Sequence, residues 1–411
     1  MVVVDILNKK RIGKELSYQE LDFIFNGYLN GTVKDYQMSS LLMAICINGM
    51  SDEEIFALTK IFIDSGDILD FGDSGIIVDK HSTGGIGDKT TLVIAPIVAS
   101  CGVPVVKMSG RGLGYTGGTI DKLESIPGFN VNLTDEKVLS QLKKIGVSIS
   151  SQTANLTPID KVIYALRDVT ATVSSIPLVA SSIMSKKIAG GADKILIDIK
   201  VGKGALLKNR EEAKKLAELM KKIGSFYQRE VRTVISDMNT PLGYCIGNSL
   251  EVLEAIDILK GKQYGTVLSE LCIDLAADMV SMGKEISKND AKIMVLDSLN
   301  KGKAYAKFLE LVKAQGGNID KIKVSDKKQK IKADRDGIIK KIDALAVGKL
   351  SVELGAGRKT KEDKVDHTVG IKLNKLVGEK VKRGDVLATL YVKDKIDLDF
   401  IDTIFTIDEE N

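Results

Sequence analysis

The sequence predicts an α/β fold, a mixed or parallel sheet flanked by helices, with a separate helical domain and a small C-terminal α+β domain. Three observations lead to this prediction. Short β-branched runs alternate with helix-length segments through the middle of the chain, whereas residues 1–65 carry helix-start signals only. From Ile331 onward, strand-length runs alternate with glycine turns. The 411 residues, 44% of them apolar, are enough for two or three domains.

Capping signals predict the N-terminal helices. Ser17 begins S-Y-Q-E, a capping-box pattern, and apolar residues follow it at helical spacing. Two more helices are expected at Ser39–Asn48 and Ser51–Ser65, and Glu54 lies three residues after the Ser51 cap of the second. This bundle, rich in Met and Leu, is either ordinary core or a subunit interface, and the residues alone leave the two about equal.

Two glycine-rich turns follow in the middle of the chain. The predicted order is a strand at Gly75–Lys80, a turn, a helix at Thr90–Ser100, a strand at Val103–Met108, a second turn, and a helix over Asp121–Ile126. In a parallel sheet both turns lie at the carboxyl ends of neighbouring strands and precede helix N-termini. The free N–H groups and partial positive charge of those termini favour an anion.

Lysines and hydroxyl groups in these turns indicate a phosphate site. Lys80 is followed two residues later by Ser82, and Lys107 is followed in the same way by Ser109. Either stretch alone could be a plain tight turn, but two with this pattern favour a shared phosphate site. Neither matches a dinucleotide or nucleoside-triphosphate loop, so a free or sugar-linked phosphate fits better than NAD or ATP. The predicted phosphate ligands are Lys80, Ser82, Thr91, Lys107, Ser109 and Thr119.

The next elements extend the pattern. Helices are predicted at Asp135–Ile145, Ile159–Val169 (after Thr157-Pro158, a cap followed by proline), Val179–Ile188, Arg210–Ile223 and Leu250–Leu259, and strands at Val147–Ser150, Lys194–Val201 and Val231–Ser236. Tyr164 and Arg167 share one helix face, as do Ser182 and Lys186. The donors of Arg167, Ser182 and Lys186 suit the carbonyls and ring nitrogens of a flat heterocycle, although such residues on helices are usually solvated.

Charge and cysteine content exclude several function classes. The net charge of +4 is small for this length, and the lysine-dense run Lys321–Arg335 has no interleaved aromatic residues. We therefore expect an exposed edge or linker there, and no nucleic-acid partner. The four scattered cysteines form no C-x-x-C pair, which favours thiols in a reducing cytoplasm. No apolar run suits a membrane span or a signal peptide, so a cytoplasmic location without a membrane partner is expected.

Two motifs carry a family resemblance. K-H-S-T-G-G-I-G-D (Lys80–Asp88) and S-G-R-G-L-G-Y-T-G-G-T-I-D-K-L-E (Ser109–Glu124) resemble the signature region of thymidine and pyrimidine-nucleoside phosphorylases, and the likeness runs essentially the whole chain. It implies reversible phosphorolysis of pyrimidine nucleosides (uridine, thymidine, deoxyuridine) to base and (deoxy)ribose 1-phosphate. It also implies inorganic phosphate as co-substrate, no organic cofactor, and a homodimer formed through the N-terminal bundle.

A third motif carries the pyrimidine site. The segment R-D-V-T-A-T-V-S-S-I-P-L (Arg167–Leu178) and the following S-S-I-M-S-K-K resemble the base-binding region of this family. The resemblance places Arg167, Ser182 and Lys186 on the pyrimidine, with Tyr164 and Leu113 lining the same pocket. His81 lies inside the first turn, where it could protonate or hydrogen-bond the 2-oxo group of the leaving base. The expected catalytic residues are His81, Lys80 and Arg167.

Some members of the family hold a potassium ion. Carried over, its positions here are Gly87, Lys89, Leu242, Cys245 and Glu254, mostly through backbone carbonyls. Lys89 departs from this pattern, because a smaller neutral residue such as threonine is expected there. Its added positive charge counts against a bound cation.

Three domains are predicted. Residues 1–65 and 159–190 form a helical domain with the dimer interface and the pyrimidine half-site. Residues 70–155 and 191–325 form the α/β phosphate-binding domain, and residues 331–411 resemble a biotinyl/lipoyl-type barrel without the Met-Lys-Met carrier tip. Because the two half-sites fall in different domains, closure on ligand binding is expected.

Three other readings remain open. A phosphoribosyltransferase on a related fold would need a diphosphate leaving group and Mg²⁺. A nucleoside-binding protein without catalysis would not turn over with phosphate. The third alternative is a thymidine phosphorylase restricted to 2′-deoxynucleosides, since no residue in the sequence decides how a 2′-hydroxyl is treated.

Overall fold

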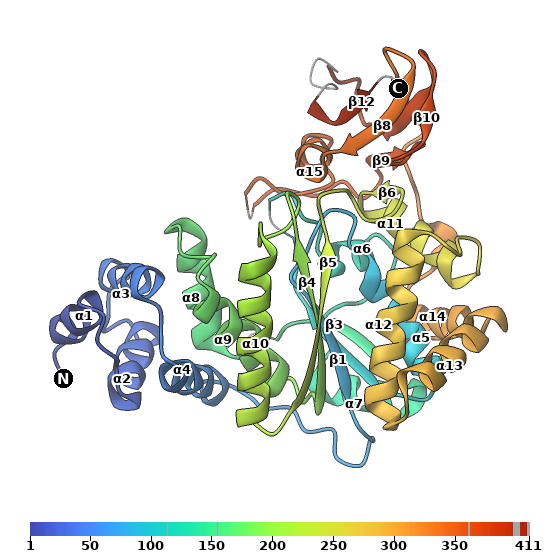
Figure 1. The fold of residues 1–411 in the computed structure, drawn as a ribbon. Coiled ribbons are helices and arrows are strands. Elements are labelled where there is room, and N and C mark those ends of the chain that lie inside the picture. The colour runs from blue at the N-terminus through green and yellow to red at the C-terminus, as the bar shows by residue number, and fades with distance from the viewer. Residues whose placement is uncertain (113, 154, 361, 398–402, 409–411) are drawn as a thin grey trace. The chain divides into compact units, whose positions relative to one another are not determined.

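The computed structural model describes residues 1–112, 114–153, 155–360, 362–397 and 403–408. The chain forms two compact units (Figure 1). The first contains residues 1–73, 152–197 and 210–234, and the second contains residues 74–151, 198–209 and 235–411. Two strands, β4 (Lys194–Val201) and β5 (Glu230–Asp237), begin in the first unit and end in the second.

The first unit is mostly helical. Its helices are α1 (Val3–Arg11), α2 (Tyr18–Leu29), α3 (Asp35–Asn48), α4 (Asp52–Asp64), α8 (Pro158–Val169), α9 (Ile176–Ala189) and α10 (Arg210–Phe226). The predicted capping boxes at Ser17 and Ser51 are confirmed, because each hydroxyl accepts from the backbone N–H three residues on. The core includes Phe25 and Phe62, whose rings meet edge to face 5.8 Å apart.

Two helix starts differ from the prediction. Helix α3 begins at Asp35, four residues before Ser39, because the Gln37 side chain accepts from the Lys34 N–H and extends the cap upstream. Thr157 does not cap α8. Its φ of +48° is left-handed and its side chain makes no cap hydrogen bond, while Pro158 takes the first helical position as predicted.

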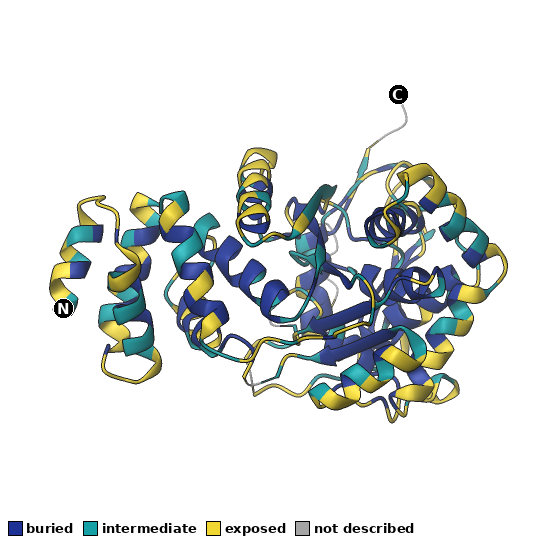
Figure 2. Ribbon diagram, turned by 90° about the horizontal axis from the view of Figure 1, so that it is seen from below, coloured by how far each residue is buried: buried dark blue, intermediate teal, exposed yellow. Residues whose placement is uncertain are grey.

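The second unit contains the sheet that carries the glycine-rich turns. Strand β1 (Val78–Ser82) lies in the order β1-β4-β5, and β2 (Val105–Ser109) pairs in parallel with β3 (Val147–Ser151). The Val78 N–H donates to the Pro104 carbonyl at 3.3 Å, so β1 runs beside β2. Figure 2 shows buried residues concentrated in these central strands. The ends of β1 and β2 are therefore neighbours, as the sequence predicted.

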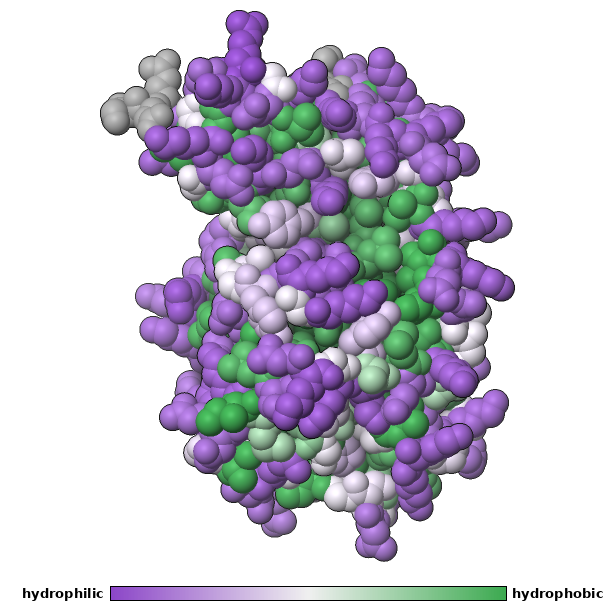
Figure 3. All heavy atoms as spheres, turned by 90° about the vertical axis from the view of Figure 1, so that its right-hand side faces the viewer, coloured by the Kyte–Doolittle hydropathy of each residue, from purple (hydrophilic) through white to green (hydrophobic). Residues whose placement is uncertain are grey.

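Helices pack around this sheet. They are α5 (Thr90–Ser100), α6 (Thr119–Glu124), α7 (Asp135–Ile145), α11 (Asn248–Leu259), α12 (Val267–Lys284), α13 (Lys288–Asn300) and α14 (Lys303–Ala314). Helix α5 is buried along nearly its whole length, against α12 and α14. The last three helices were not predicted. Figure 3 shows hydrophilic side chains over much of the face on which α13 and α14 lie.

The C-terminal segment forms two small antiparallel sheets, with orders β10-β8-β12 and β6-β9-β11-β7. One strand, β6 (Cys245–Ile246), comes from the segment before α11. The other elements follow a 3₁₀ turn at Ile319–Lys321 and are β7 (Lys328–Lys332), β8 (Gly337–Ile342), α15 (Ala344–Glu353), β9 (Gly370–Leu373), β10 (Lys380–Val381), β11 (Val386–Tyr391) and β12 (Phe405–Asp408). Strand β7 is a largely exposed edge strand, so the lysine-dense run is an exposed edge as expected. The likeness to a biotinyl/lipoyl barrel stays a prediction.

No helix in the described ranges combines the length and apolarity that crossing a membrane requires.

Candidate active site

The first glycine-rich turn leaves β1 at Ser82 and reaches α5 at Thr90. The Thr83 N–H donates to the Asp198 carbonyl at 3.1 Å, and the Thr83 hydroxyl accepts from the Lys200 N–H at 2.8 Å. The Gly84 N–H donates to the Ser82 hydroxyl at 3.2 Å. These bonds fix the turn against the end of β4.

Asp88 organises this turn. Its carboxylate accepts from the Ser82 hydroxyl and, at 2.6 Å, from the Thr90 hydroxyl. Burial alone would raise the pKa of this carboxylate, but the ammonium groups of Lys80, Lys200 and Lys122, together with the Ser82 hydrogen bond, outweigh burial and hold that pKa well below its usual range. The site therefore keeps a fixed negative charge among several cations.

Lys80 and Lys107 reach the same place from neighbouring strands. The Lys80 ammonium donates to the Thr90 hydroxyl at 2.5 Å and lies 3.7 Å from the Asp198 carboxylate. The Lys107 ammonium lies 3.9 Å from the Asp79 carboxylate. Both lysines line one small pocket together with Thr91. The structure thus brings three of the six predicted phosphate ligands together.

The second glycine-rich turn runs from Ser109, at the end of β2, to Thr119, the first residue of α6. The Asp121 carboxylate accepts from the Gly112 N–H at 2.6 Å and pairs with the Arg358 guanidinium at 2.7 Å. Arg358 also donates to the Gly112 carbonyl at 3.1 Å. A residue near α15 therefore holds this turn closed.

In the helical unit, α8 and α9 gather the predicted pyrimidine donors. The Lys186 ammonium donates to the Ser182 hydroxyl at 3.0 Å and pairs with the buried Asp160 carboxylate. The Tyr164 ring lies 5.7 Å from the Lys186 ammonium and 5.9 Å from the Arg167 guanidinium.

Arg167 is nearly fully buried, at 1% exposure, and shapes the connection between α8 and α9. Its guanidinium donates to the carbonyls of Thr172, Leu178 and Val173 at 3.2, 3.3 and 2.6 Å. Burial lowers the pKa of this guanidinium, against the opposing effect of the Asp160 carboxylate. Its contacts in the structure are therefore those of a residue that holds a turn.

Comparison with known proteins decides the family. Models of the glycosyl transferase family match residues 74–305 with its a/b domain and residues 4–66 with its helical bundle domain, and a pyrimidine nucleoside phosphorylase C-terminal domain matches residues 338–404. Pyrimidine-nucleoside phosphorylases of Geobacillus stearothermophilus and Bacillus subtilis (strain 168) are 50% and 49% identical over 399 residues, which are 95% of this chain and 92% of each relative. The chain belongs to the pyrimidine-nucleoside phosphorylase family.

A solved structure shares the fold. Anthranilate phosphoribosyltransferase from Thermus thermophilus has a TM-score of 0.59 and 18% identity, and the match covers 76% of this chain and 99% of that chain. This likeness supports the helical and α/β architecture of a pyrimidine-nucleoside phosphorylase and carries no argument about substrate.

The remaining predicted residues of the phosphorylase site are placed as follows. His81 lies in β1 and is partly exposed, one residue after Lys80. Ser109 and Thr119 lie at the two ends of the second turn. Leu113, the expected pocket residue, lies outside the described residues.

Lys89 fills the place where the family resemblance puts a potassium ion. Lys89 is itself one of the five predicted ligand positions, and its side chain reaches three of the other four, which are Gly87, Leu242, Cys245 and Glu254. The ammonium donates to the Leu242 carbonyl at 2.9 Å, the Cys245 carbonyl at 2.8 Å and the Glu254 carboxylate at 2.7 Å. The oxygens that would hold an ion are bound to a fixed cation, so these residues do not fit a potassium ion.

Several supporting residues of the phosphorylase site lie outside the predicted set of site residues. Asp88, Asp121 and Lys122 are among them, although they lie inside the two signature motifs. Asp198 and Lys200 are charged residues two apart in the buried part of strand β4, among apolar neighbours, a signal that could have singled them out. Arg358 lies 246 positions from Gly112, and no local pattern points to it.

Proposed function

We propose that the chain catalyses the reversible phosphorolysis of uridine, thymidine and deoxyuridine to free base and (deoxy)ribose 1-phosphate. The observation that carries this proposal is the pair Lys80 and Lys107, which lie in the neighbouring strands β1 and β2 and line one small pocket, in a member of this family. A restriction to 2′-deoxynucleosides is the less favoured alternative.

The phosphate is assigned to Lys80, Ser82, Thr91, Lys107, Ser109 and Thr119. Phosphate near neutral pH is already an anionic nucleophile and needs no general base. The task of these residues is to hold it close to C1′ of the sugar, since proximity and orientation supply a large part of such a rate enhancement. The bond between C1′ and the base nitrogen breaks as the bond between C1′ and a phosphate oxygen forms.

The base departs with negative charge, which a donor must stabilise. Ser182 and Lys186 are assigned to the pyrimidine ring, with Tyr164 beside them. Arg167 contributes to the same half-site chiefly by shaping the turn after α8. His81, next to Lys80, is assigned to protonate or hydrogen-bond the 2-oxo group.

Phosphorolysis requires both half-sites to act on one nucleoside, although they belong to different units. We therefore propose that binding of phosphate and nucleoside together closes the enzyme. Small-angle scattering with and without both ligands tests this. Superimposable curves would contradict closure.

Base release is the test of the reaction. Thymidine, 2′-deoxyuridine and uridine are each incubated with and without inorganic phosphate, in the absence of added magnesium. Phosphate-dependent release from all three supports the proposal, and release from the deoxynucleosides alone supports the restricted alternative. Absence of phosphate-dependent release from any of them overturns the proposal.

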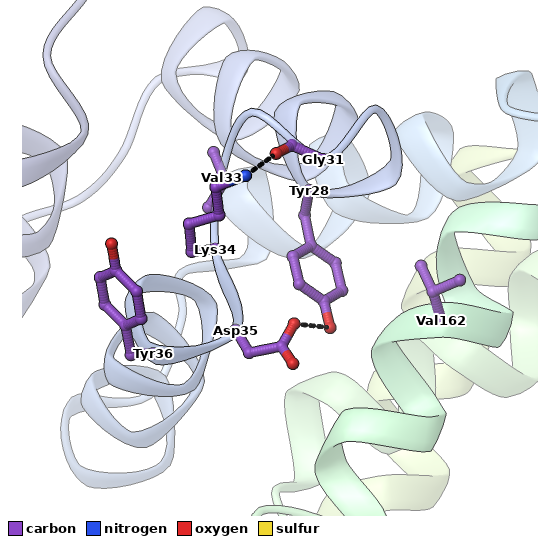
Figure 4. A pocket seen from close by; sticks show the side chains of 7 residues that line it. All are labelled: Tyr28, Gly31, Val33, Lys34, Asp35, Tyr36 and Val162. Carbon is purple, nitrogen blue, oxygen red and sulfur yellow. Dashed lines mark hydrogen bonds between the residues drawn. The ribbon is translucent and has the colours of Figure 1, made fainter.

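A homodimer through the N-terminal helices is also proposed. Helix α3 presents Tyr36, Met43 and Ile47 on one face, and Tyr36 and Ile47 are 74% and 75% exposed. Beside it, an open pocket is lined by residues of α2, α3 and α8, with the Tyr28 hydroxyl donating to Asp35 at 3.1 Å (Figure 4). The mass in solution, measured by light scattering for the wild type and Ile47→Glu, tests the interface, since a wild-type monomer contradicts it.

Four free thiols support a cytoplasmic location.

A further inference from the structure

The Lys89 side chain is enclosed in a cradle of oxygen atoms. Lys89 is 1% exposed, and its ammonium makes three hydrogen bonds of 2.7 to 2.9 Å, to the carbonyls of Leu242 and Cys245 and to the carboxylate of Glu254. An ammonium has three N–H donors, so these bonds satisfy it completely. Burial alone would lower the pKa of Lys89, but the carboxylates of Glu254 and Glu251 together outweigh burial and the pKa is raised.

The cradle is built for a cation and not merely for a lysine. Glu254 also accepts from the N–H groups of Tyr244 and Cys245, at 2.7 and 2.9 Å, which holds both carboxylate oxygens in place. Gly87 has a φ of +75°, and a Cβ there would lie 2.5 Å from the Leu242 carbonyl oxygen. Backbone therefore approaches backbone as closely as glycine permits. Carbonyl and carboxylate oxygens gathered in this way are also the ligands of alkali cations.

The cradle bears directly on the phosphate turn. Lys89 stands between Asp88, which accepts from the Ser82 hydroxyl, and Thr90, whose hydroxyl accepts from Lys80. Holding the Lys89 ammonium against Leu242 and Cys245 therefore fixes the segment that orients two predicted phosphate ligands. Through Cys245, which pairs with Lys372 in β9, the same contact reaches the C-terminal sheet.

We propose that the Lys89 ammonium serves as a built-in monovalent cation in this chain, so that the phosphate turn is held without potassium. Lys89 is thus a positioning residue. A neutral side chain at position 89 leaves Glu254 and two carbonyls without a cation, and opens the cradle to an ion from solution. A charge left buried alone is strongly destabilising, which gives the ion a reason to bind.

The test is thermal unfolding of Lys89→Thr in chloride salts of choline, lithium, sodium and potassium at constant ionic strength. We expect a lowered Tm in choline and lithium and a saturable rise of several degrees with potassium. The matched control is Lys10→Thr, which breaks another buried Lys–Glu pair. Lys10 donates to both Glu54 oxygens at 2.7 Å, and among the described residues its ammonium donates to no backbone carbonyl. Lys10→Thr should lose stability without potassium-specific recovery.

Wild type gives a second measurement that does not depend on the folding of a variant. Its Tm and its phosphate-dependent turnover should be the same in potassium and in choline. A wild type that needs potassium for either, or a folded Lys89→Thr whose Tm ignores the identity of the cation, overturns the proposal. Adding Glu254→Gln to Lys89→Thr should abolish the potassium response.

Turnover is a separate readout, which rests on the proposed function. Lys89→Thr should lose about tenfold to a hundredfold in kcat/KM for phosphate without potassium and recover with it. If the unfolding results hold but no nucleoside is cleaved by the wild type, the proposed function fails and the cation replacement stands.

Discussion

The ammonium of Lys122 donates to the main-chain carbonyl of Asp88 at 2.6 Å. Lys122 belongs to α6, behind the second glycine-rich turn, and Asp88 lies at the end of the first. The same ammonium pairs with the Glu251 carboxylate of α11 at 2.9 Å and lies 3.4 Å from the Gly117 carbonyl. One buried side chain therefore joins both turns to a third element, and the spacing of the turns depends on it.

Lys122→Met is expected to loosen both turns and leave Glu251 buried without its cation. Removing one partner of a buried ion pair costs about 3–5 kcal/mol, to be measured by urea unfolding. We also expect a rise of about tenfold or more in the KM for phosphate, because the two turns lose their common anchor. In the control Lys60→Met, which breaks an exposed pair with Asp64, the cost should stay within about 1 kcal/mol. An unchanged phosphate KM in Lys122→Met would show that the turns are aligned by other contacts.

Asp88→Asn tests the charge balance of the first turn. Burial alone would raise the pKa of this carboxylate, but the nearby ammonium groups lower that pKa by a larger amount. The carboxylate therefore titrates at lower pH in the folded chain than in the unfolded chain. Its contribution to stability is complete above about pH 5 and is lost as pH falls through the folded-state pKa. We expect Asp88→Asn to be less stable by about 3–5 kcal/mol at pH 7, with the difference from wild type shrinking below about pH 4.

The measurement is the free energy of unfolding of both proteins from pH 7 down to pH 3. The control is Asp326→Asn, at an exposed position outside the site, which should follow wild type throughout. A difference that is the same at every pH would mean that the effect of Asp88→Asn is one of shape and not of charge.

The four thiols should differ sharply in reactivity. Burial raises the pKa of Cys245 and of Cys272 to about 12, and it raises the pKa of the half-buried Cys46 and of Cys101 as well. Since the thiolate is the reactive form, we expect a disulfide reagent at about pH 8 to label Cys46 slowly and the other three only after unfolding.

Labelling should speed up as pH rises toward the raised pKa of each thiol. Cys46→Ser is the control that removes the one slow native phase. Rapid native labelling of Cys272 would contradict the packing around α12.

The sheet and its turns were predictable because their signals are local. A strand end, a lysine two residues before a serine, and glycines before a helix start all lie within a short window, and β1, β2, α5 and α6 appear within three residues of their expected bounds. The start of β1 at Val78, later than Gly75, follows from its pairing, since the Val78 N–H makes the contact to Pro104.

The contacts that hold those turns were not predictable, since their partners are far apart in the chain. Arg358 bonds Gly112, and Lys89 bonds Leu242, 153 positions away. Lys89 illustrates the limit most clearly. The sequence shows that a lysine replaces a smaller residue beside a possible ion site, but only the structure shows that its ammonium takes the oxygens of that site.

Arg167 and Ser182 should separate structure from binding in the pyrimidine half-site. Arg167→Lys keeps the positive charge but cannot reproduce the planar fork that meets the carbonyls of Thr172, Val173 and Leu178. Each lost bond to a charged donor is worth about 1.5–3 kcal/mol, so we expect lowered stability together with a raised nucleoside KM.

Ser182→Ala removes only a hydroxyl that accepts from Lys186, so its stability should change by about 1 kcal/mol or less while the nucleoside KM rises. Urea unfolding and initial rates at varied nucleoside, with phosphate saturating, measure both effects in each variant. If Arg167→Lys raised the KM without any loss of stability, the guanidinium would be acting on the substrate and not on the turn. The KM for phosphate should be unchanged in both variants, because neither residue is among the predicted phosphate ligands of the glycine-rich turns.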